Sequence, residues 1–183
     1  MELPNRKPTR LNNYDYNSNG YYFVTICTNN KRKILCDIVG DGALDVPQIV
    51  LSKIGKIVEK YIISSNNISE ITVDKYVIMP NHIHLILIVE NNGTSKEDSL
   101  TVRGRCHEVT EGDGFVKPSP TNNIISHTVS TLKRFINHEV GNNIFQRSFH
   151  DHIIRDEADY LKIWNYIDTN PQKWNEDCFY IAD

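Results

Sequence analysis

The sequence predicts an α+β protein, a ferredoxin-like sandwich in which helices cover one face of an antiparallel sheet, with a further helix at the C-terminal end. Two observations predict it. Apolar residues run nearly unbroken in some segments, as in buried strands, and recur every three or four residues in others, as in helices. These segments follow the order strand, helix, strand, strand, helix, strand, helix. The length of 183 residues is that of one domain, which we expect to span residues 1–183.

The first strand and the first helix are expected before residue 64. Aromatic and β-branched residues fill Tyr21–Thr28, directly after a turn signal at residues 17–20, so this segment is predicted to be a buried strand. In Leu51–Ile63 the apolar residues have helical spacing, and Ser52 is a candidate N-cap.

Two more strands are expected in the middle of the chain, over Ile71–Met79 and His84–Val89. Pro80 and Asn81 join them, which favours a hairpin. After this hairpin the periodicity is lost, and residues 91–120 collect Gly, Ser, Thr, Glu and Pro. We expect this segment to be a flexible insertion, to which the sequence assigns no role.

Helical spacing returns in Ile124–Val140 and again in Ala158–Asp168. Between these helices, Ile144–Ile154 is expected to be extended. The helix over Ala158–Asp168 is therefore the one added to the sandwich.

The composition excludes several classes of protein. A hydrophobic content of 39% and a charged content of 23% are typical of soluble globular proteins, and no apolar run approaches the roughly 20 residues that span a bilayer. The first ten residues have no apolar segment behind their charges, so we expect no secretory signal and a cytoplasmic protein. Four scattered cysteines are too few for a disulfide framework or a paired-cysteine zinc site.

The formal net charge of −3 is unevenly distributed along the chain. Residues 1–35 contain six basic and two acidic residues, whereas residues 156–183 contain two basic and seven acidic ones. A net negative total therefore does not exclude a basic face that binds nucleic acid.

Two histidines separated by one residue form the sharpest local signal. Side chains alternate along a strand, so His82 and His84 project from the same face and their imidazoles can reach one cation. Tyr166 and Asn170 are four residues apart and share one face of the last helix, where an amide oxygen can complete the coordination of Mg²⁺ or Mn²⁺. The ordinary alternatives are an exposed polar pair, a core tyrosine and a helix stop before Pro171.

Six motifs follow one another along the chain: Arg10-Leu11 with Tyr14-Asp15-Tyr16, Tyr22-Phe23-Val24-Thr25, Met79-Pro80-Asn81-His82-Ile83-His84, Phe145-Gln146-Arg147-Ser148-Phe149, Asp151-His152-Ile153-Ile154-Arg155, and Tyr166-Ile167 with Asn170-Pro171. With these motifs the chain resembles the single-tyrosine HUH transposases, and most closely their REP-associated tyrosine transposase group. The resemblance runs from Arg10 to about Trp174.

The resemblance implies an enzyme that cleaves and rejoins single-stranded DNA next to hairpins through a covalent 5′-phosphotyrosine intermediate. It implies that His82 and His84 bind a divalent metal, Mg²⁺ or Mn²⁺, that Tyr166 is the nucleophile and that Asn170 is the third ligand. Insertion-element relatives commonly have Gln at the position of Asn170. Single-stranded or hairpin DNA is the expected partner, no membrane is involved, and the protein is expected to be a monomer or a homodimer.

Basic side chains are the candidates for contact with the DNA backbone, because they neutralise phosphates. These candidates are Arg6, Lys7, Arg10, Lys31, Arg32, Lys33, Lys133 and Arg134. For His152 and Arg155, phosphate binding and ordinary packing are equally open.

Rival interpretations are also open. His150 and His152 repeat the spacing of the first pair and are a rival metal site, although the resemblance favours His82 and His84. Tyr160, six residues before Tyr166, faces another side of the helix and is a poor second nucleophile.

A second function would be that of a non-catalytic ferredoxin-like DNA-binding regulatory module. A metal-independent two-histidine phosphodiesterase would need two His-x-Ser/Thr motifs, which neither His82-Ile83-His84 nor His127-Thr128-Val129 supplies. The presence of both histidines, the tyrosine and the asparagine favours an active enzyme.

Overall fold

The computed structural model describes residues 16–40, 47–67, 70–90 and 123–181. The predicted insertion at residues 91–120 and the candidates Arg6, Lys7 and Arg10 lie outside the described residues. In chain order the main elements are β1 (Gly20–Cys27), β2 (Cys36–Val39), β3 (Gln48–Leu51), α1 (Lys53–Ser64), β4 (Ile71–Ile78), β5 (His82–Val89), α2 (Ile124–Val140), β6 (His150–Ile154) and α3 (Glu157–Thr169).

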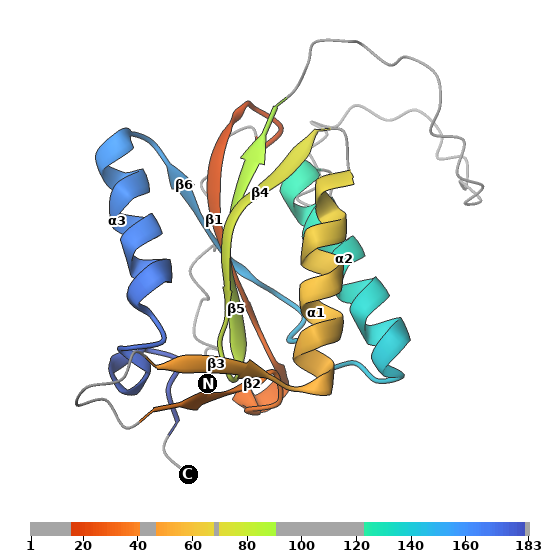
Figure 1. Cartoon of the computed structure of the whole chain (residues 1–183). Helices are drawn as coiled ribbons and strands as arrows, with labels where there is room; N and C mark the ends of the chain where they lie inside the picture. Colours follow the sequence, from red (N-terminus) through yellow and green to blue (C-terminus); the bar gives the residue numbers. More distant parts are fainter. Residues whose placement is uncertain (1–15, 41–46, 68–69, 91–122, 182–183) are drawn as a thin grey trace, which may run out of the picture.

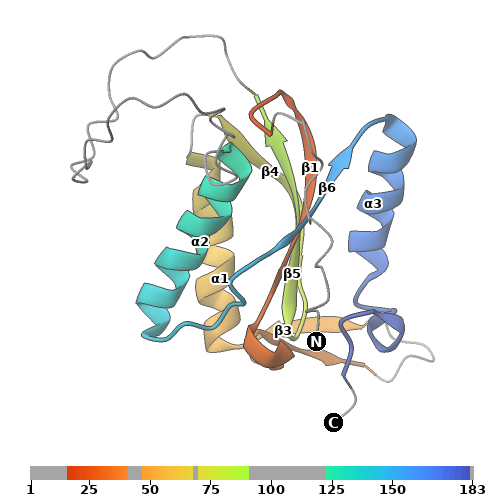
Figure 2. The ribbon, with the colours of Figure 1, turned by 180° about the vertical axis from the view of Figure 1, so that it is seen from behind.

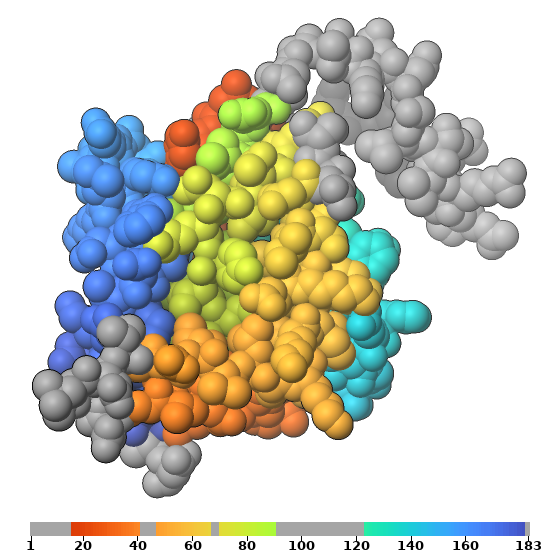
Figure 3. Space-filling view, in the orientation of Figure 1, coloured from red at the N-terminus to blue at the C-terminus, as the bar shows by residue number. Residues whose placement is uncertain are grey.

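A four-stranded antiparallel sheet with the strand order β4-β5-β1-β6 forms the centre of the molecule. Helices α1 and α2 cover one face of this sheet and α3 covers the other (Figures 1 and 2). From the side, the sheet is visible between α1 and α3 (Figure 3). The predicted α+β sandwich with an added C-terminal helix is therefore confirmed.

Successive side chains of the two central strands, β1 and β5, point to opposite faces of the sheet, and this determines which helices each side chain contacts. Val24 and Ile26 of β1 and Leu85 of β5 belong to the hydrophobic core between the sheet and the helices α1 and α2. His82 and His84 occupy the alternate positions of β5. Both histidines consequently project from the face that α3 covers.

The helix boundaries follow from their capping residues. The side chain of Asn123 accepts a hydrogen bond from Ser126 N at 2.7 Å, and Gly141 ends α2 in the left-handed conformation at a φ of 78°, so α2 has the predicted bounds. Ser52 caps α1 as expected, accepting from Gly55 N at 3.0 Å.

The extended segment after α2 is shorter than predicted. The strand β6 begins at His150, and residues 144–149 form a loop instead. Within this segment Phe145 still forms an isolated antiparallel bridge with Thr28, through Gln146 N donating to Cys27 O and Asn29 N donating to Ile144 O. The competing hydrogen bonds come from the Lys133 ammonium, which donates to the carbonyls of Gln146 and Ser148. The loop is thereby held to α2 and to the end of the sheet.

A second, two-stranded sheet of β2 and β3 lies at one end of the molecule (Figure 1). The sequence did not predict it, because four residues per strand give too short a period-2 pattern to recognise. The described helices include none that is long and apolar enough to cross a membrane.

Candidate functional site

His82 and His84 are held in fixed orientations on β5. His84 Nδ1 lies 2.8 Å from Thr25 Oγ1 of the neighbouring strand, and His82 Nδ1 lies 2.8 Å from Asn81 Oδ1. The remaining ring nitrogens, the two Nε2 atoms, are 2.9 Å apart. Because each ring is fixed through its Nδ1 atom, both Nε2 atoms point toward one place, as a pair of metal ligands requires.

Burial keeps this histidine pair uncharged. Neither side chain is exposed beyond 1%. Desolvation is the largest cause that lowers the pKa of His82 to about 4, against the opposing effect of Asp177. Desolvation, followed by the neighbouring His82, lowers the pKa of His84 well below its ordinary value. A neutral imidazole carries the lone pair that a metal ion binds, so both rings are in the binding form at neutral pH.

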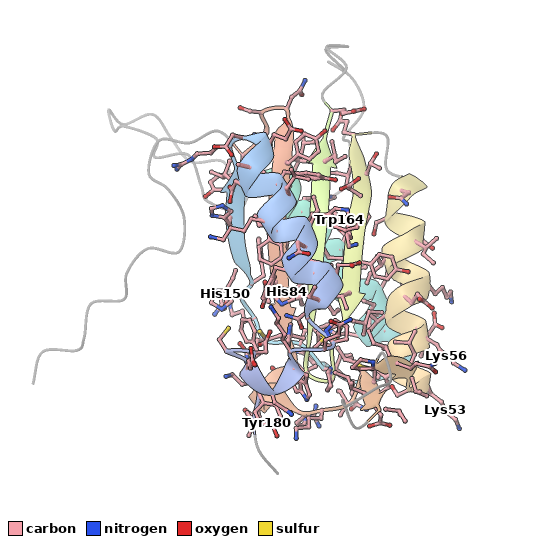
Figure 4. All side chains as sticks on the ribbon, turned by 60° about the vertical axis from the view of Figure 1, so that its left-hand side comes forward. Lys53, Lys56, His84, His150, Trp164 and Tyr180 are labelled. Carbon is pink, nitrogen blue, oxygen red and sulfur yellow. The ribbon has the colours of Figure 1, made fainter. Side chains whose placement is uncertain are left out.

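Tyr166 reaches the histidine pair from α3. Its hydroxyl oxygen lies 3.3 Å from His84 Nε2, and the hydroxyl donates to Asp177 Oδ2 at 2.9 Å. Its ring packs edge-on against Phe23 of β1, with 6.1 Å between the ring centroids. Figure 4 shows His84 beneath α3, in the layer between the helix and the sheet. The tyrosine is 37% exposed, so a ligand from solvent can approach it.

The Tyr166 hydroxyl is protonated at neutral pH. Burial, followed by the hydrogen bond to the Asp177 carboxylate, raises the pKa of Tyr166 far above its usual range. A phenol in this state is a weak nucleophile, so the tyrosine needs a proton acceptor or a nearby cation before it can attack.

Asn170 ends α3 one turn beyond Tyr166 and is 2% exposed. Its amide nitrogen donates to Asp177 Oδ2 at 2.8 Å. The amide oxygen Oδ1 is buried and has no hydrogen-bond partner among the described residues. An unpaired buried acceptor is costly, and a bound cation would remove that cost.

Asp177 is a site residue that the sequence interpretation did not identify. It follows the short 3-10 helix at Trp174–Glu176, which returns the chain to the sheet. Its carboxylate is fully buried, with Oδ2 4.0 Å from His82 Nε2, and one ligand atom each from His82, His84 and Asp177 lie within 4.8 Å of one another. No spacing rule predicts this residue, because it lies beyond the last helix in a stretch that the sequence presents only as acidic.

Phe179 covers the histidine pair. Its ring centroid is 4.7 Å from that of His82 and 6.0 Å from that of His84. Both backbone polar groups of Phe179 are hydrogen-bonded: Asn81 Nδ2 donates to its carbonyl oxygen at 2.8 Å, and its N–H donates to Asp177 Oδ1 at 2.6 Å. The C-terminal segment therefore forms one wall of the site.

These side chains fit a divalent cation. Two neutral imidazole nitrogens and one carboxylate form a mixed nitrogen and oxygen donor set that Mn²⁺ accepts, and that Mg²⁺ tolerates when oxygen ligands complete its shell. The unpaired amide oxygen of Asn170 is a further acceptor of the kind that these cations bind. Within the described parts of the chain, His82, His84 and Asp177 are the one such group of three.

The rival pair has a different environment. His152 Nε2 lies 2.8 Å from Asp159 Oδ2 of α3, and the His152 side chain is 53% exposed. The His150 ring lies 6.2 Å from that of Phe179. The two rings have separate partners, and neither joins a group of metal-ligating side chains in the described residues.

The basic candidates are divided between two regions. Lys31 Nζ lies 5.6 Å from the centre of the Phe179 ring and Lys33 Nζ lies 5.4 Å from that of Tyr180, so the segment that contains Arg32 borders the site. Lys133 and Arg134 lie on α2, across the sheet from α3.

Two further predicted residues lie away from the histidine pair. Arg155 is exposed beside the N-terminus of α3. The Tyr160 hydroxyl donates to Asp74 Oδ2 at 2.7 Å, and that bond is the largest cause that raises the pKa of Tyr160 to about 12.

Comparisons with known proteins add a relative and a structural neighbour. An uncharacterized protein of Haemophilus influenzae (strain ATCC 51907 / DSM 11121 / KW20 / Rd) is 31% identical over 190 residues, which cover 98% of this chain and 95% of that protein. No family model matches the chain. A REP-associated tyrosine transposase, solved with a REP hairpin bound, is similar with a TM-score of 0.56 and 20% identity, over 90% of this chain and 73% of that one. At this identity the likeness establishes a common fold.

Proposed function

The chain belongs to the family of the Haemophilus influenzae protein and has the fold of the REP-associated tyrosine transposases, and we propose that it also has the chemistry of that group. It cleaves and rejoins single-stranded DNA next to hairpins, and Tyr166 forms the covalent 5′-phosphotyrosine intermediate. The substrate class is suggested by the hairpin DNA bound to the structural neighbour. On this proposal residues 1–183 act as one domain, in which residues 91–120 are an insertion.

One observation carries the proposal. The Tyr166 hydroxyl lies 3.3 Å from His84 Nε2, beside the Nε2 atom of His82. These groups are more than 80 residues apart in the chain, and the hydrophobic core that joins Ile163 and Ile167 of α3 to Ile86 of β5 holds them side by side. A nucleophile directly beside a ligand pair is the arrangement that phosphoryl transfer to tyrosine needs.

The proposed ligands of the divalent cation are His82, His84, Asn170 and Asp177. When bound, Mg²⁺ or Mn²⁺ would withdraw charge from a non-bridging oxygen of the scissile phosphate. Thr25 and Asn81 keep the imidazole rings in place through their Nδ1 atoms. Buried and neutral, the rings need no deprotonation before they coordinate.

Tyr166 supplies the new bond. Its oxygen attacks phosphorus, the bond from phosphorus to the 3′ oxygen breaks, and that oxygen takes up a proton to become a free 3′-hydroxyl. The tyrosine proton already points at the Asp177 carboxylate, which is the nearest acceptor. Because the phosphotyrosine conserves the energy of the broken diester, a 3′-hydroxyl can reverse the reaction and rejoin the strands.

The test is formation of a covalent adduct. The full chain is incubated with single-stranded hairpin oligonucleotides and Mg²⁺ or Mn²⁺, and adducts that resist denaturation are separated by electrophoresis. We expect an adduct from the wild-type protein, none from Tyr166→Phe, and none in EDTA. Tyr160→Phe is the matched control and should react like the wild type.

Two results would change the conclusion. An adduct formed by Tyr166→Phe would exclude Tyr166 as the nucleophile. Hairpin binding by the wild type without any adduct, over a broad set of hairpins, would instead indicate the non-catalytic DNA-binding module.

A further inference from the structure

A groove whose lining residues are mostly polar lies on the side of the molecule away from α3. It is formed by the second half of α2, from Ser130 to His138, and by the chain that follows the helix, from Gly141 to Arg147. We name it the α2 groove. Its volume is about 750 Å³, enough for a nucleotide, and it is open to solvent along its length.

The α2 groove is held in shape by hydrogen bonds across it. At its floor the ammonium of Lys133, which is 9% exposed, donates to the carbonyls of Gln146 and Ser148, both at 2.8 Å. Asn137 Oδ1 accepts from Ile144 N at 3.0 Å and its Nδ2 donates to Asn143 Oδ1 at 3.1 Å. The two walls are therefore fixed before any ligand arrives, which lowers the entropic cost of binding.

The charge of the α2 groove is positive. Arg134 and Arg147 are exposed along it, and its described lining contains no Asp or Glu. Burial lowers the pKa of Lys133 to about 8, so this residue still adds a positive charge at neutral pH. Guanidinium groups bind phosphate through two parallel hydrogen bonds, which makes an anionic phosphodiester the fitting ligand.

Amide groups accompany the charges. Asn142 and Asn143 are exposed in the turn that ends α2. An Asn side chain offers both a donor and an acceptor, which is the combination that pairs with the edge of an unstacked base. The guanidinium groups match the phosphate of a nucleotide and the amides match its base. Inorganic phosphate would use the guanidinium groups alone.

Only a few residues of chain separate the α2 groove from the border of the proposed catalytic centre. Gln146 lines the groove, and four residues later the ring of His150 lies 6.2 Å from that of Phe179, which covers His82. Four residues of extended chain span at most about 14 Å. A few nucleotides of single strand cover that distance around the start of β6.

We propose that the α2 groove binds an unpaired nucleotide of the DNA strand that Tyr166 attacks, with Arg134 and Arg147 on its phosphate and Asn142 at the edge of its base. This inference rests on the proposed function, to which it adds the site that receives the single-stranded flank of the hairpin.

The test compares two fluorescent probes, a hairpin with a single-stranded flank of random sequence and the same hairpin without a flank. Binding is measured by anisotropy across a salt series. The Arg134→Ala/Arg147→Ala variant should bind the flanked probe at least about tenfold more weakly, with the slope of log affinity against log salt reduced by about 0.7, the value for one phosphate of a single strand. Its affinity for the probe without a flank should match that of the wild type.

The matched control is Lys53→Ala/Lys56→Ala. It removes the same number of positive charges from α1, on the far side of the molecule from His150 (Figure 4). We expect it to bind both probes as the wild type does. An equal loss in the control would mean that only total charge matters, and this would overturn the proposal.

A second readout tests the contact with the base. Flanks recovered from the wild-type complex are sequenced and should be enriched in one base at one position. The Asn142→Ala variant should lose that enrichment while it keeps most of its affinity. Enrichment that survives in Asn142→Ala would exclude base readout by this residue.

Failure of the groove and failure of the proposed function give different results. If the arginine variant binds both probes as the wild type does, while the wild type forms its Tyr166 adduct, the groove proposal alone is wrong. An equal loss for both probes would mean that the groove holds the hairpin stem, which also overturns it. A wild type that binds neither probe would overturn the proposed function, and the groove assignment with it.

Discussion

Single side chains determine what the candidate site can bind. Thr25 and Asn81 turn the two imidazoles toward one point, and burial keeps both rings neutral. Asp177 then adds a carboxylate to the two imidazoles, which completes the three-residue group found among the described residues. The site is thus prepared for a cation by orientation, by desolvation and by one negative charge.

Removal of that charge should weaken metal binding. Asp177→Asn keeps the shape of the side chain and loses the carboxylate, so we expect Mn²⁺ to bind at least about tenfold more weakly, as measured by titration calorimetry. Asp168→Asn is the control, because Asp168 is an exposed carboxylate on α3 that pairs with Lys75. Unchanged affinity in Asp177→Asn would exclude Asp177 from the metal site.

The neutral histidines should also make stability depend on pH. The pKa of His82 is about 4 in the folded protein against an ordinary value of 6.5, so the unfolded chain binds more protons between these two pH values. The free energy of unfolding of the metal-free protein should therefore rise with pH from about 4 to 6.5, and fall as the pH is lowered through this window.

Thermal unfolding in EDTA at several pH values measures this effect. We expect His82→Gln/His84→Gln to show a smaller rise in melting temperature over the window, whereas His138→Gln, which alters an exposed histidine, should follow the wild type. Parallel curves for the wild type and the double variant would contradict the neutral pair.

Secondary-structure elements bring these residues together, and contacts between elements limit what each can accommodate. Helix α1 packs so closely on the chain before β2 that a Cβ atom at Gly55 would clash with Leu35 O. A backbone carbonyl cannot move aside as a flexible side chain can, so only glycine fits at this position.

Gly55→Ala should cost more than about 2 kcal/mol in the free energy of unfolding, because the helix must shift away from Leu35. Gly141→Ala is the comparison: its φ of 78° disfavours alanine, but no atom lies within 4 Å, and about 1 kcal/mol is expected. Urea denaturation measures both. A smaller loss for Gly55→Ala than for Gly141→Ala would contradict the close packing.

Elements with a long local pattern were predicted from the sequence, and short segments without one, held by tertiary contacts, were not. Helix α2 has its predicted bounds because Asn123 and Gly141 cap it. The loop before β6 was predicted to be extended because its apolar residues resemble a strand, yet its backbone bonds to Lys133 of α2.

The candidate site shows the same division. Spacing places His82 with His84, and Tyr166 with Asn170, on one face of an element, and the resemblance to the single-tyrosine HUH transposases then singled out all four. Asp177 was missed because it reaches the site only through the path of the C-terminal segment, which depends on Asn81 and Phe179. Tertiary contacts of that kind leave no periodic trace in a sequence.

At the scale of the whole molecule, charge is segregated. The net charge is −3, but Lys31 and Lys33 border the site and Arg134 and Arg147 line the α2 groove, while acidic residues gather at the start of α3. Among the described residues, these cations mark a path along which a DNA strand would meet favourable charge. Indiscriminate attraction to DNA should be weak.

This distribution predicts selective binding. At physiological salt the affinity for a hairpin with a single-stranded flank should exceed that for a blunt duplex of the same length by at least about tenfold. Competition between the two in an anisotropy assay gives the ratio. Equal affinity would show that net electrostatic attraction, and not a specific path, holds the DNA.

The most direct test of the proposed function is to locate the covalent bond. Adducts formed with a hairpin oligonucleotide and Mn²⁺ are digested with nuclease and protease, and the modified peptide is sequenced by mass spectrometry. We predict a nucleotide joined through its 5′-phosphate to the oxygen of Tyr166, and no such modification on another residue. A modification at Tyr160 or at a histidine, or an unmodified Tyr166 in a preparation that cleaves the DNA, would contradict the proposed mechanism.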